Sequence, residues 1–143
     1  MKIAIASDHG GYELKENIKK YLESRDIETV DLGTYSEESV DYPAFGKACG
    51  DAVASGKVDR GIVCCGTGIG ISIVANKVKG IRCALCTDTY MAEMSRRHND
   101  SNILALGGRT TGVDKALRIT KAWIDTEFEG GRHQRRVNML NDM

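Results

Sequence analysis

The segment Gly61–Gly70 (GIVCCGTGIG) contains the residues of this chain whose types and spacing most clearly allow chemistry. Its apolar run predicts a buried strand that leads into Cys65, and the apolar spacing from Ile69 onward predicts a helix. Glycines between a strand and a helix let the backbone approach a ligand closely, and the free amides of a first helical turn attract anions. Because such a loop favours negative charge, a thiol at its start has a physical reason to ionise. We predict that Cys65 is a reactive thiol at a catalytic centre.

The elements that must position this loop are predicted from the rest of the chain. Five apolar runs predict strands, and they are Lys2–Ser7, Ile27–Leu32, Arg60–Cys64, Ile81–Cys86 and Ile103–Leu106. Helical spacing predicts a helix after each strand, and the basic residues 131–143 predict a C-terminal helical tail. Strands that are apolar throughout and alternate with helices are typical of a parallel sheet covered on both faces. We therefore predict a single domain over residues 1–143, with a three-layer α/β/α Rossmann-like fold and a five-stranded parallel sheet.

The composition argues against several classes of protein. The chain has 143 residues, and 20 basic residues balance 20 acidic ones, so its charge does not indicate a nucleic-acid or anionic-membrane partner. No apolar run approaches the roughly 20 residues that span a bilayer, and the first residues are typical of a strand rather than a signal peptide. The five cysteines are an odd number without the spacing of a short-loop disulfide framework. We expect a cytoplasmic protein with reduced thiols.

Polar residues follow three of the predicted strands. Asp8 and His9 follow the first strand, the loop from Gly66 to Gly70 follows the third, and Arg109 follows the fifth. In parallel α/β sheets, ligands bind beyond the carboxyl ends of the strands, where the strand order reverses. If the first and third strands are neighbours, Asp8, His9 and Cys65 converge on one crevice.

The predicted helix that contains Met91 and Met94 leads back to the opposite edge of the sheet. His98 and Asn99 stand at its end, so we expect them far from Cys65 within one chain. If His98 and Asn99 act in the same site as Cys65, a second subunit must supply them. We therefore expect a homo-oligomer.

Several candidate residues also have a purely structural interpretation. Asp8 is a suitable N-cap, and His98 continues the stripe of Met91 as a core histidine would. Arg132 and Arg136 stand one helical turn apart, where they could grip a phosphate or belong to a solvated basic face. The sequence alone leaves these alternatives open.

Cys83 and Cys86 have the C-x-x-C spacing of many zinc and redox sites. Within a strand, residues three apart face opposite sides of the sheet, so their sulfurs cannot share one metal ion. One pair also falls short of the roughly four ligands that zinc requires. We predict that Cys49, Cys64 and Cys83 are core residues.

Five segments that together span most of the chain resemble one known family. They are IAIASDHGGYELK at the start, DLGTYSEESVDYP, GIVCCGTGIGISIVANKVKGIRCAL, RRHND and LGGR. On these segments the chain is similar to the type B ribose-5-phosphate isomerases of the ribose/galactose isomerase superfamily. The resemblance implies a homodimeric enzyme, without metal or cofactor, whose active site is shared between subunits. It implies interconversion of D-ribose 5-phosphate and D-ribulose 5-phosphate through an enediolate, in the pentose phosphate pathway.

The resemblance also implies a role for each candidate residue. Cys65 would be the general base that moves a proton between C1 and C2, since Ile69 and Gly70 carry no acid that could replace it. His98 would help to open the furanose ring, with Asp8 nearby. The other substrate-binding residues would be Gly66, Thr67, Gly68, Ile69 and Gly70 around the enediolate and sugar, Asn99 on sugar oxygens, and His9, Arg109, Arg132 and Arg136 around the phosphate.

Other functions remain open from the sequence. The same scaffold serves allose-6-phosphate and galactose-6-phosphate isomerases, which act on longer sugars. A non-catalytic phosphosugar-binding sensor would have no need of a thiol base at Cys65. A redox protein would instead use Cys64 and Cys65 as a reversible disulfide.

Overall fold

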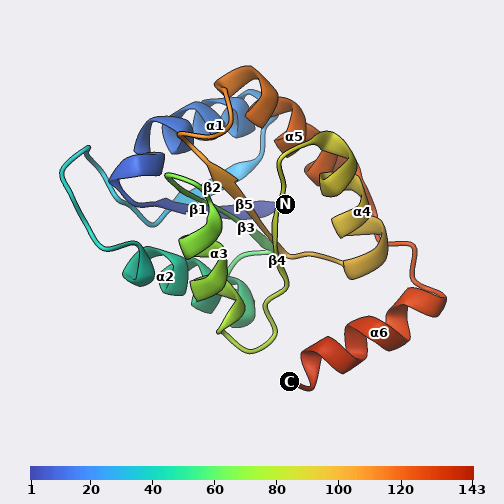
Figure 1. Cartoon of the computed structure of the whole chain (residues 1–143). Coiled ribbons are helices and arrows are strands. Elements are labelled where there is room, and N and C mark those ends of the chain that lie inside the picture. The colour runs from blue at the N-terminus through green and yellow to red at the C-terminus, as the bar shows by residue number, and fades with distance from the viewer.

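The computed structural model describes the whole chain, residues 1–143, as one parallel sheet between layers of helices (Figure 1). The sheet has the strand order β2-β1-β3-β5-β4. The strands are β1 (Lys2–Ser7), β2 (Glu28–Asp31), β3 (Arg60–Cys65), β4 (Cys83–Leu85) and β5 (Ile103–Gly107). The helices are α1 (Tyr12–Ser24), α2 (Tyr42–Ala54), α3 (Ile69–Asn76), α4 (Thr89–Asn99), α5 (Val113–Asp125) and α6 (Arg132–Asn141), with a short 3₁₀ turn at His9–Gly11. The predicted α/β fold with a five-stranded parallel sheet is confirmed.

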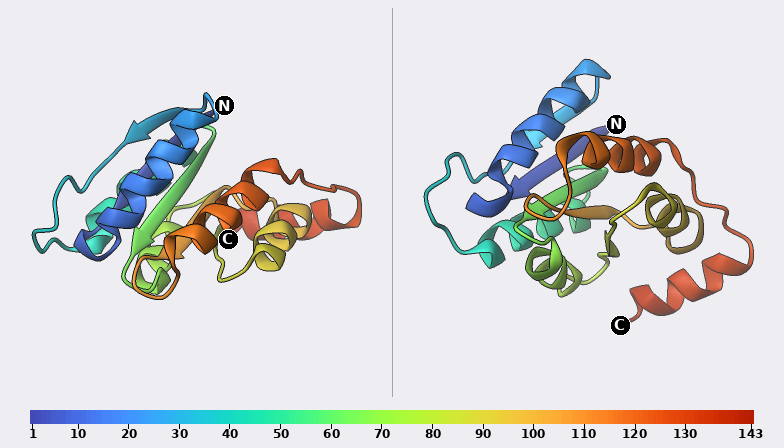
Figure 2. Two further views of the ribbon diagram at one scale, coloured as in Figure 1. Left: turned by 90° about the horizontal axis from the view of Figure 1, so that it is seen from above. Right: turned by 45° about the horizontal axis from the view of Figure 1, so that its top comes forward.

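Side chains of the central strands alternate between two apolar clusters, one on each face of the sheet. On β1, Ile3 and Ile5 belong to one cluster, and Ala4 belongs to the other. Helices α1 and α5 cover the first face, whereas α2 and α3 cover the second (Figure 2). Because both faces are buried, β1, β3 and β5 are apolar almost throughout, as the sequence pattern predicted.

The edge strands are shorter than predicted. Strand β4 pairs only with β5, and its ladder begins at Cys83. The preceding Arg82 amide donates to Oδ1 of Asn102 at 2.8 Å, and the Ile81 amide donates to the carbonyl oxygen of Val78. Local polar contacts thus replace ladder hydrogen bonds where the apolar run predicted more strand.

All five cysteines are free thiols. Cys64 packs in the cluster beneath α1 and α5, and Cys65 packs in the cluster on the opposite face. Cys86 and Cys83 are divided between the two clusters in the same way, as the alternation of a strand requires. Burial raises the pKa of Cys49 to about 12 and that of Cys86 to about 11, so both remain neutral core groups.

The buried face of α4 agrees with the sequence pattern only in part. Met91 was predicted on that face and is exposed, whereas Ser95 of the same predicted face is buried, and so is Arg96. Both turn towards Ser101, because Ser95 Oγ lies 2.8 Å from Ser101 Oγ and Arg96 Nη1 donates to the Ser101 carbonyl oxygen. His98 is half-buried and stacks on α6, so it does not continue a core stripe.

Helix α6 packs against α4 and lies outside the layers that cover the sheet (Figures 1 and 2). Its buried residues are His133 and Val137. The predicted C-terminal helix is therefore present. Besides packing on α4, it is held by Asn141 Oδ1, which accepts a hydrogen bond from Arg82 Nη1 at 2.6 Å. None of the helices is both long enough and apolar enough to cross a membrane.

Candidate active site

The loops that follow β1, β3 and β5 are held together at the carboxyl edge of the sheet. The Gly108 amide donates to the carbonyl oxygen of Cys65 at 2.8 Å, and the Arg109 amide donates to that of Gly66 at 2.9 Å. The turn after β1 touches the same loop, since a Cβ atom on Gly10 would lie 3.1 Å from the Gly66 nitrogen. The strand order reverses between β1 and β3, where such sheets bind ligands. Strands β1 and β3 are neighbours, which is the condition that the sequence set for a convergence of Asp8, His9 and Cys65. Their convergence on one crevice stays a prediction.

Cys65 ends β3 with only 5% of its surface exposed. Its Sγ accepts a hydrogen bond from the Gly68 amide at 3.2 Å. Gly68 has a φ of 79°, and a Cβ atom there would lie 2.6 Å from Cδ1 of Leu85, so the turn requires glycine. This turn directs a backbone N–H group at the sulfur.

The rest of the glycine loop leads into α3. Thr67 Oγ1 accepts the amide of Ile69, the first residue of the helix, at 3.2 Å. Tyr42 lies against the loop, since a Cβ atom on Gly70 would lie 2.8 Å from its ring. Sequence reasoning missed Tyr42, and its place before the helix-starting Pro43 was the only signal.

A hollow of about 400 Å³ lies beside these loops, and His9, Arg109, Glu13 and Glu37 are among the residues that line it. Arg109 extends along the glycine loop, because a Cβ atom on Gly66 would lie 3.4 Å from its Nη1. A guanidinium and an imidazole that line the same hollow suit an anionic group such as a phosphate. Sequence reasoning missed the two glutamates, whose negative charge repels an anion.

His9 is held in one tautomer by the loop before α2. Its Nδ1 accepts the Val40 amide at 3.1 Å, so the proton of the neutral ring is on Nε2. Nε2 is therefore a hydrogen-bond donor without any need for the ring to become charged.

We predict that ¹⁵N NMR spectra recorded while the His9 ring is uncharged show an unprotonated Nδ1 and a protonated Nε2. A second histidine, His133, provides an internal reference for ring nitrogens in the same spectra. A His9 ring that is mostly protonated on Nδ1 would contradict the Val40 contact.

Asp8 has the capping role that its sequence position allowed. Its Oδ1 accepts the Gly11 amide at 3.1 Å, and the residue is 8% exposed. A Cβ atom on Gly11 would lie 2.5 Å from the Cys64 carbonyl carbon, so this turn packs directly on β3. The N-cap interpretation is confirmed, and a contact between Asp8 and sugar stays a prediction.

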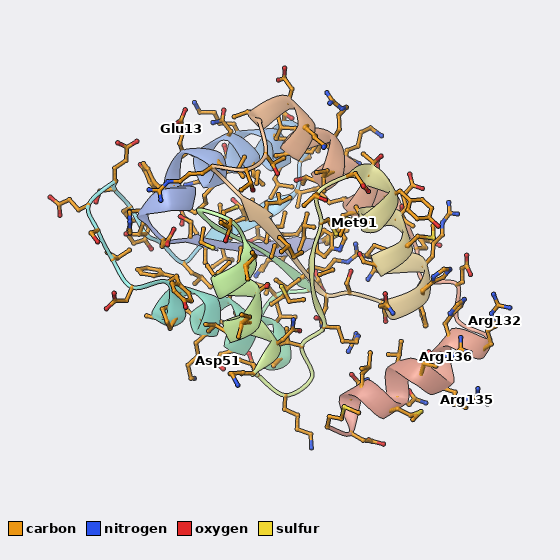
Figure 3. The ribbon with its side chains drawn as sticks, in the orientation of Figure 1. Glu13, Asp51, Met91, Arg132, Arg135 and Arg136 are labelled. Carbon is orange, nitrogen blue, oxygen red and sulfur yellow. The ribbon has the colours of Figure 1, made fainter.

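The remaining candidates lie on α4 and α6, away from the loop of Cys65, and they are His98, Asn99, Arg132 and Arg136. Helix α4 ends before β5 begins, whereas Cys65 pairs with Gly107 at the end of β5. The intervening strand is on the order of 13 Å long. Arg132 and Arg136 project from α6 at the edge of the molecule (Figure 3). The predicted separation of His98 from Cys65 within one chain is confirmed.

His98, Glu129 and His133 form the one group of at least three side chains whose possible metal-ligand atoms lie within 4.8 Å of one another. The two imidazole rings stack, with centroids 4.3 Å apart and planes 15° from parallel. Imidazole lone pairs lie in the ring plane, so near-parallel rings do not direct them at a common ion. The arrangement is a stacked pair with an acid beside it. Sequence reasoning missed Glu129 and His133, whose spacing of four residues was the only signal.

Comparison with known proteins identifies what this fold and site belong to. A family model described as Ribose/Galactose Isomerase matches residues 3–140. The chain is 49% identical over 139 residues to ribose-5-phosphate isomerase B of Escherichia coli, covering 97% of this chain and 93% of the relative. It is 41% identical over 141 residues to D-erythrulose-4-phosphate isomerase of Pectobacterium atrosepticum, covering 98% and 93%. The solved structure of Clostridium thermocellum ribose-5-phosphate isomerase B has a TM-score of 0.98 and 59% identity, and the match covers 99% of this chain and 96% of that chain.

These matches define an enzyme that isomerises sugars. The chain belongs to the ribose/galactose isomerase family. Its resemblance to the type B ribose-5-phosphate isomerases, seen first in the sequence segments, is confirmed.

Proposed function

We propose that this isomerase interconverts D-ribose 5-phosphate and D-ribulose 5-phosphate in the pentose phosphate pathway, with Cys65 as the general base. The observation that carries the proposal is the Cys65 sulfur at the end of β3, with the Gly68 amide directed at it. The hollow lined by His9 and Arg109 supplies a place for the phosphate. The relatives from E. coli and C. thermocellum support this substrate, because both are named ribose-5-phosphate isomerase B.

Cys65 acts on the open-chain sugar. The thiolate takes the proton from C2 of the aldose, the C2–H electron pair forms a C1=C2 bond, and negative charge moves to O1. The thiol then returns a proton to C1, while a proton passes from O2 to O1. The ketose forms with no net gain or loss of protons, so one group serves as base and acid.

The glycine loop stabilises the enediolate. Amides within Gly66–Gly70 are fixed by the turn, so they need not reorganise when charge develops on oxygen. One such donor is typically worth about 3 kcal/mol of transition-state stabilisation. The exposed Thr67 hydroxyl accepts from the Ile69 amide, which leaves its own hydrogen free for a sugar oxygen.

A second subunit completes the site in this proposal. His98 and Asn99 are too far from Cys65 to act within one chain. We place them in the partner's site, with His98 assisting ring opening and Asn99 holding sugar oxygens. Arg132 and Arg136 of the partner subunit join His9 and Arg109 around the phosphate. All three guanidinium groups are available for an anion, because none of Arg109, Arg132 and Arg136 forms a salt bridge within the chain.

Exposed apolar side chains support the homodimer. Ile69 and Ile73 of α3, next to the glycine loop, are 52% and 53% exposed. Met139 and Leu140 of α6 are 59% and 45% exposed. Covering these side chains with a partner subunit would remove apolar surface from water. The covered surface would lie beside the glycine loop of one subunit and beside α6 of the other, which both contribute to the proposed site.

The free thiols support a reducing compartment, and we propose the cytoplasm as the location of the enzyme.

A coupled assay tests the substrate. We expect kcat/KM to be at least about tenfold higher for ribose 5-phosphate than for allose 6-phosphate or galactose 6-phosphate, since one extra carbon in a closed pocket changes binding by about 1–3 kcal/mol. Erythrose 4-phosphate belongs in the same panel because of the Pectobacterium relative. A clear preference for a tetrose or hexose phosphate would contradict the proposed substrate.

Removal of Arg132 or Arg136 is expected to act on the phosphate. Arg132→Ala and Arg136→Ala should each raise KM for ribose 5-phosphate by about tenfold or more, because a charge-assisted hydrogen bond contributes about 1.5–3 kcal/mol. The effect on free ribose should be much smaller. Arg135→Ala, which removes the same charge from α6, is the matched control. Equal losses on phosphorylated and free sugars would argue against phosphate contact.

A further inference from the structure

We propose that His133, paired with Glu129, is a positioning residue that fixes the imidazole ring of His98 for opening the sugar ring. This inference rests on the proposed function and deepens it. It assigns a role to the stacked pair between α4 and α6, which the reaction at Cys65 does not use.

The contacts that carry the inference hold His133 from several sides. The residue is 7% exposed, and its ring lies 4.3 Å from that of His98. Its Nε2 lies 3.3 Å from Oε1 of Glu129. The Glu129 amide in turn donates to the carbonyl oxygen of Arg97 at 3.1 Å, directly beside His98. The acid, the buried ring and the end of α4 therefore form one connected unit.

The turn before α6 is built to make this contact. Gly130 and Gly131 have φ values of 67° and 56°, which place the chain in the left-handed region that favours glycine. The His133 amide donates to the Gly130 carbonyl oxygen at 3.1 Å, so His133 lies on the first turn of α6. The helix thus begins where its ring can cover one face of His98.

Stacking fixes a ring without occupying its nitrogens. The lone pairs and N–H bonds of His98 lie in the ring plane, whereas His133 covers a face. His98 remains half-buried, so part of the residue reaches the surface although one face of its ring is covered. A hydrogen bond to a ring nitrogen would also orient His98, but it would use an atom that proton transfer needs.

The chemistry of ring opening depends on this orientation. The C1–O4 bond of the furanose breaks, O4 takes a proton, and O1 loses its proton as the C1=O1 bond forms. A catalytic group must be held within about 0.5 Å and 10–20° of its productive geometry, and a displacement of about 1 Å can reduce the rate by about 100-fold. A ring free to rotate on α4 would lose part of that alignment.

The test separates ring opening from proton transfer at carbon. Ribose 5-phosphate enters as a furanose, whereas ribulose 5-phosphate is open-chain because its 5-hydroxyl is esterified. We compare kcat for conversion of ribose 5-phosphate with the rate at which ribulose 5-phosphate takes up deuterium at C1 from D₂O. Exchange needs Cys65 but no opening of a ring, so it reports on the base alone.

His133→Leu, which removes the stacked ring, should lower kcat for ribose 5-phosphate by about tenfold or more and change the exchange rate by less than about twofold. His133→Phe keeps a flat ring, so it should stay within about threefold of wild type. Glu129→Gln should fall between these two variants. Gln134→Ala, which changes an exposed neighbour on α6, is the matched control.

The inference would be overturned if, in both His133→Leu and His133→Phe, kcat for ribose 5-phosphate and the exchange rate of ribulose 5-phosphate fell by the same factor. It would also be overturned if kcat were unchanged in both variants. If His133→Leu does not fold, a wild-type rate in His133→Phe together with a selective loss in Glu129→Gln still supports it, and any other pattern overturns it. A wild-type enzyme that neither converts ribose 5-phosphate nor exchanges ribulose 5-phosphate would instead refute the proposed function.

Discussion

Cys65→Ala and Cys65→Ser are expected to lower kcat for ribose 5-phosphate by about 1,000-fold or more, in the upper part of the range for loss of a general base. The alanine variant has no group that can take the C2 proton. The serine variant keeps the size of the side chain, but a hydroxyl is far too weak a base at neutral pH. Steady-state assays in the direction of ribulose 5-phosphate check both values.

The adjacent Cys64 is the matched control for this experiment. Its side chain lies on the opposite face of the sheet, beneath α1 and α5, and burial raises the pKa of its thiol. Cys64→Ala should keep kcat within about threefold of wild type, because Cys64 packs in the core and does not touch the substrate. Near-normal activity in Cys65→Ala would show that another group is the base. Equal losses in the two variants would show that the effect is structural.

Mixed dimers of Cys65→Ala and His98→Asn subunits are expected to regain activity that neither variant has alone. If each site combines Cys65 of one subunit with His98 of the other, a mixed dimer contains one intact site and one doubly altered site. Random mixing makes half of the dimers mixed, so the preparation should reach about one quarter of wild-type activity. Co-refolding equal amounts of the two variants, followed by the isomerase assay, measures the recovery.

Mixing Cys65→Ala with Cys65→Ser subunits is the control, since no intact site can form in it. The mixture of Cys65→Ala and His98→Asn subunits could fail to regain activity although mass spectrometry detects mixed dimers. That result would place His98 and Cys65 of the same subunit in one site, or the two residues in separate sites. The long separation between the end of α4 and the end of β3 makes that result inconsistent with one shared reaction.

Much of this architecture could be predicted from local sequence, because the physical constraints are local. The central strands must be apolar on both faces, so Ile3, Ala4 and Ile5 identify β1 without any knowledge of its neighbours. The turn at residue 68 needs a positive φ, and the sequence has a glycine at that position, three residues after Cys65. These local features are sufficient to predict a candidate base at the end of β3.

Features that depend on distant segments could not be predicted. The tautomer of His9 depends on Val40, which belongs to the loop that leads into α2. The contact between His98 and His133 depends on how α6 packs against α4. The apolar stripe predicted a buried Met91, which is exposed, and missed the buried Arg96, which donates hydrogen bonds to Asp100 and to the Ser101 carbonyl oxygen after α4.

Exchange of the C2 hydrogen of ribose 5-phosphate with solvent deuterium reports directly on whether Cys65 is the base. We expect the wild-type enzyme to introduce deuterium at C2 on the timescale of turnover, and Cys65→Ala to do so no faster than the uncatalysed reaction. Deuterium incorporation by Cys65→Ala at the wild-type rate would contradict the assignment of Cys65 as the base.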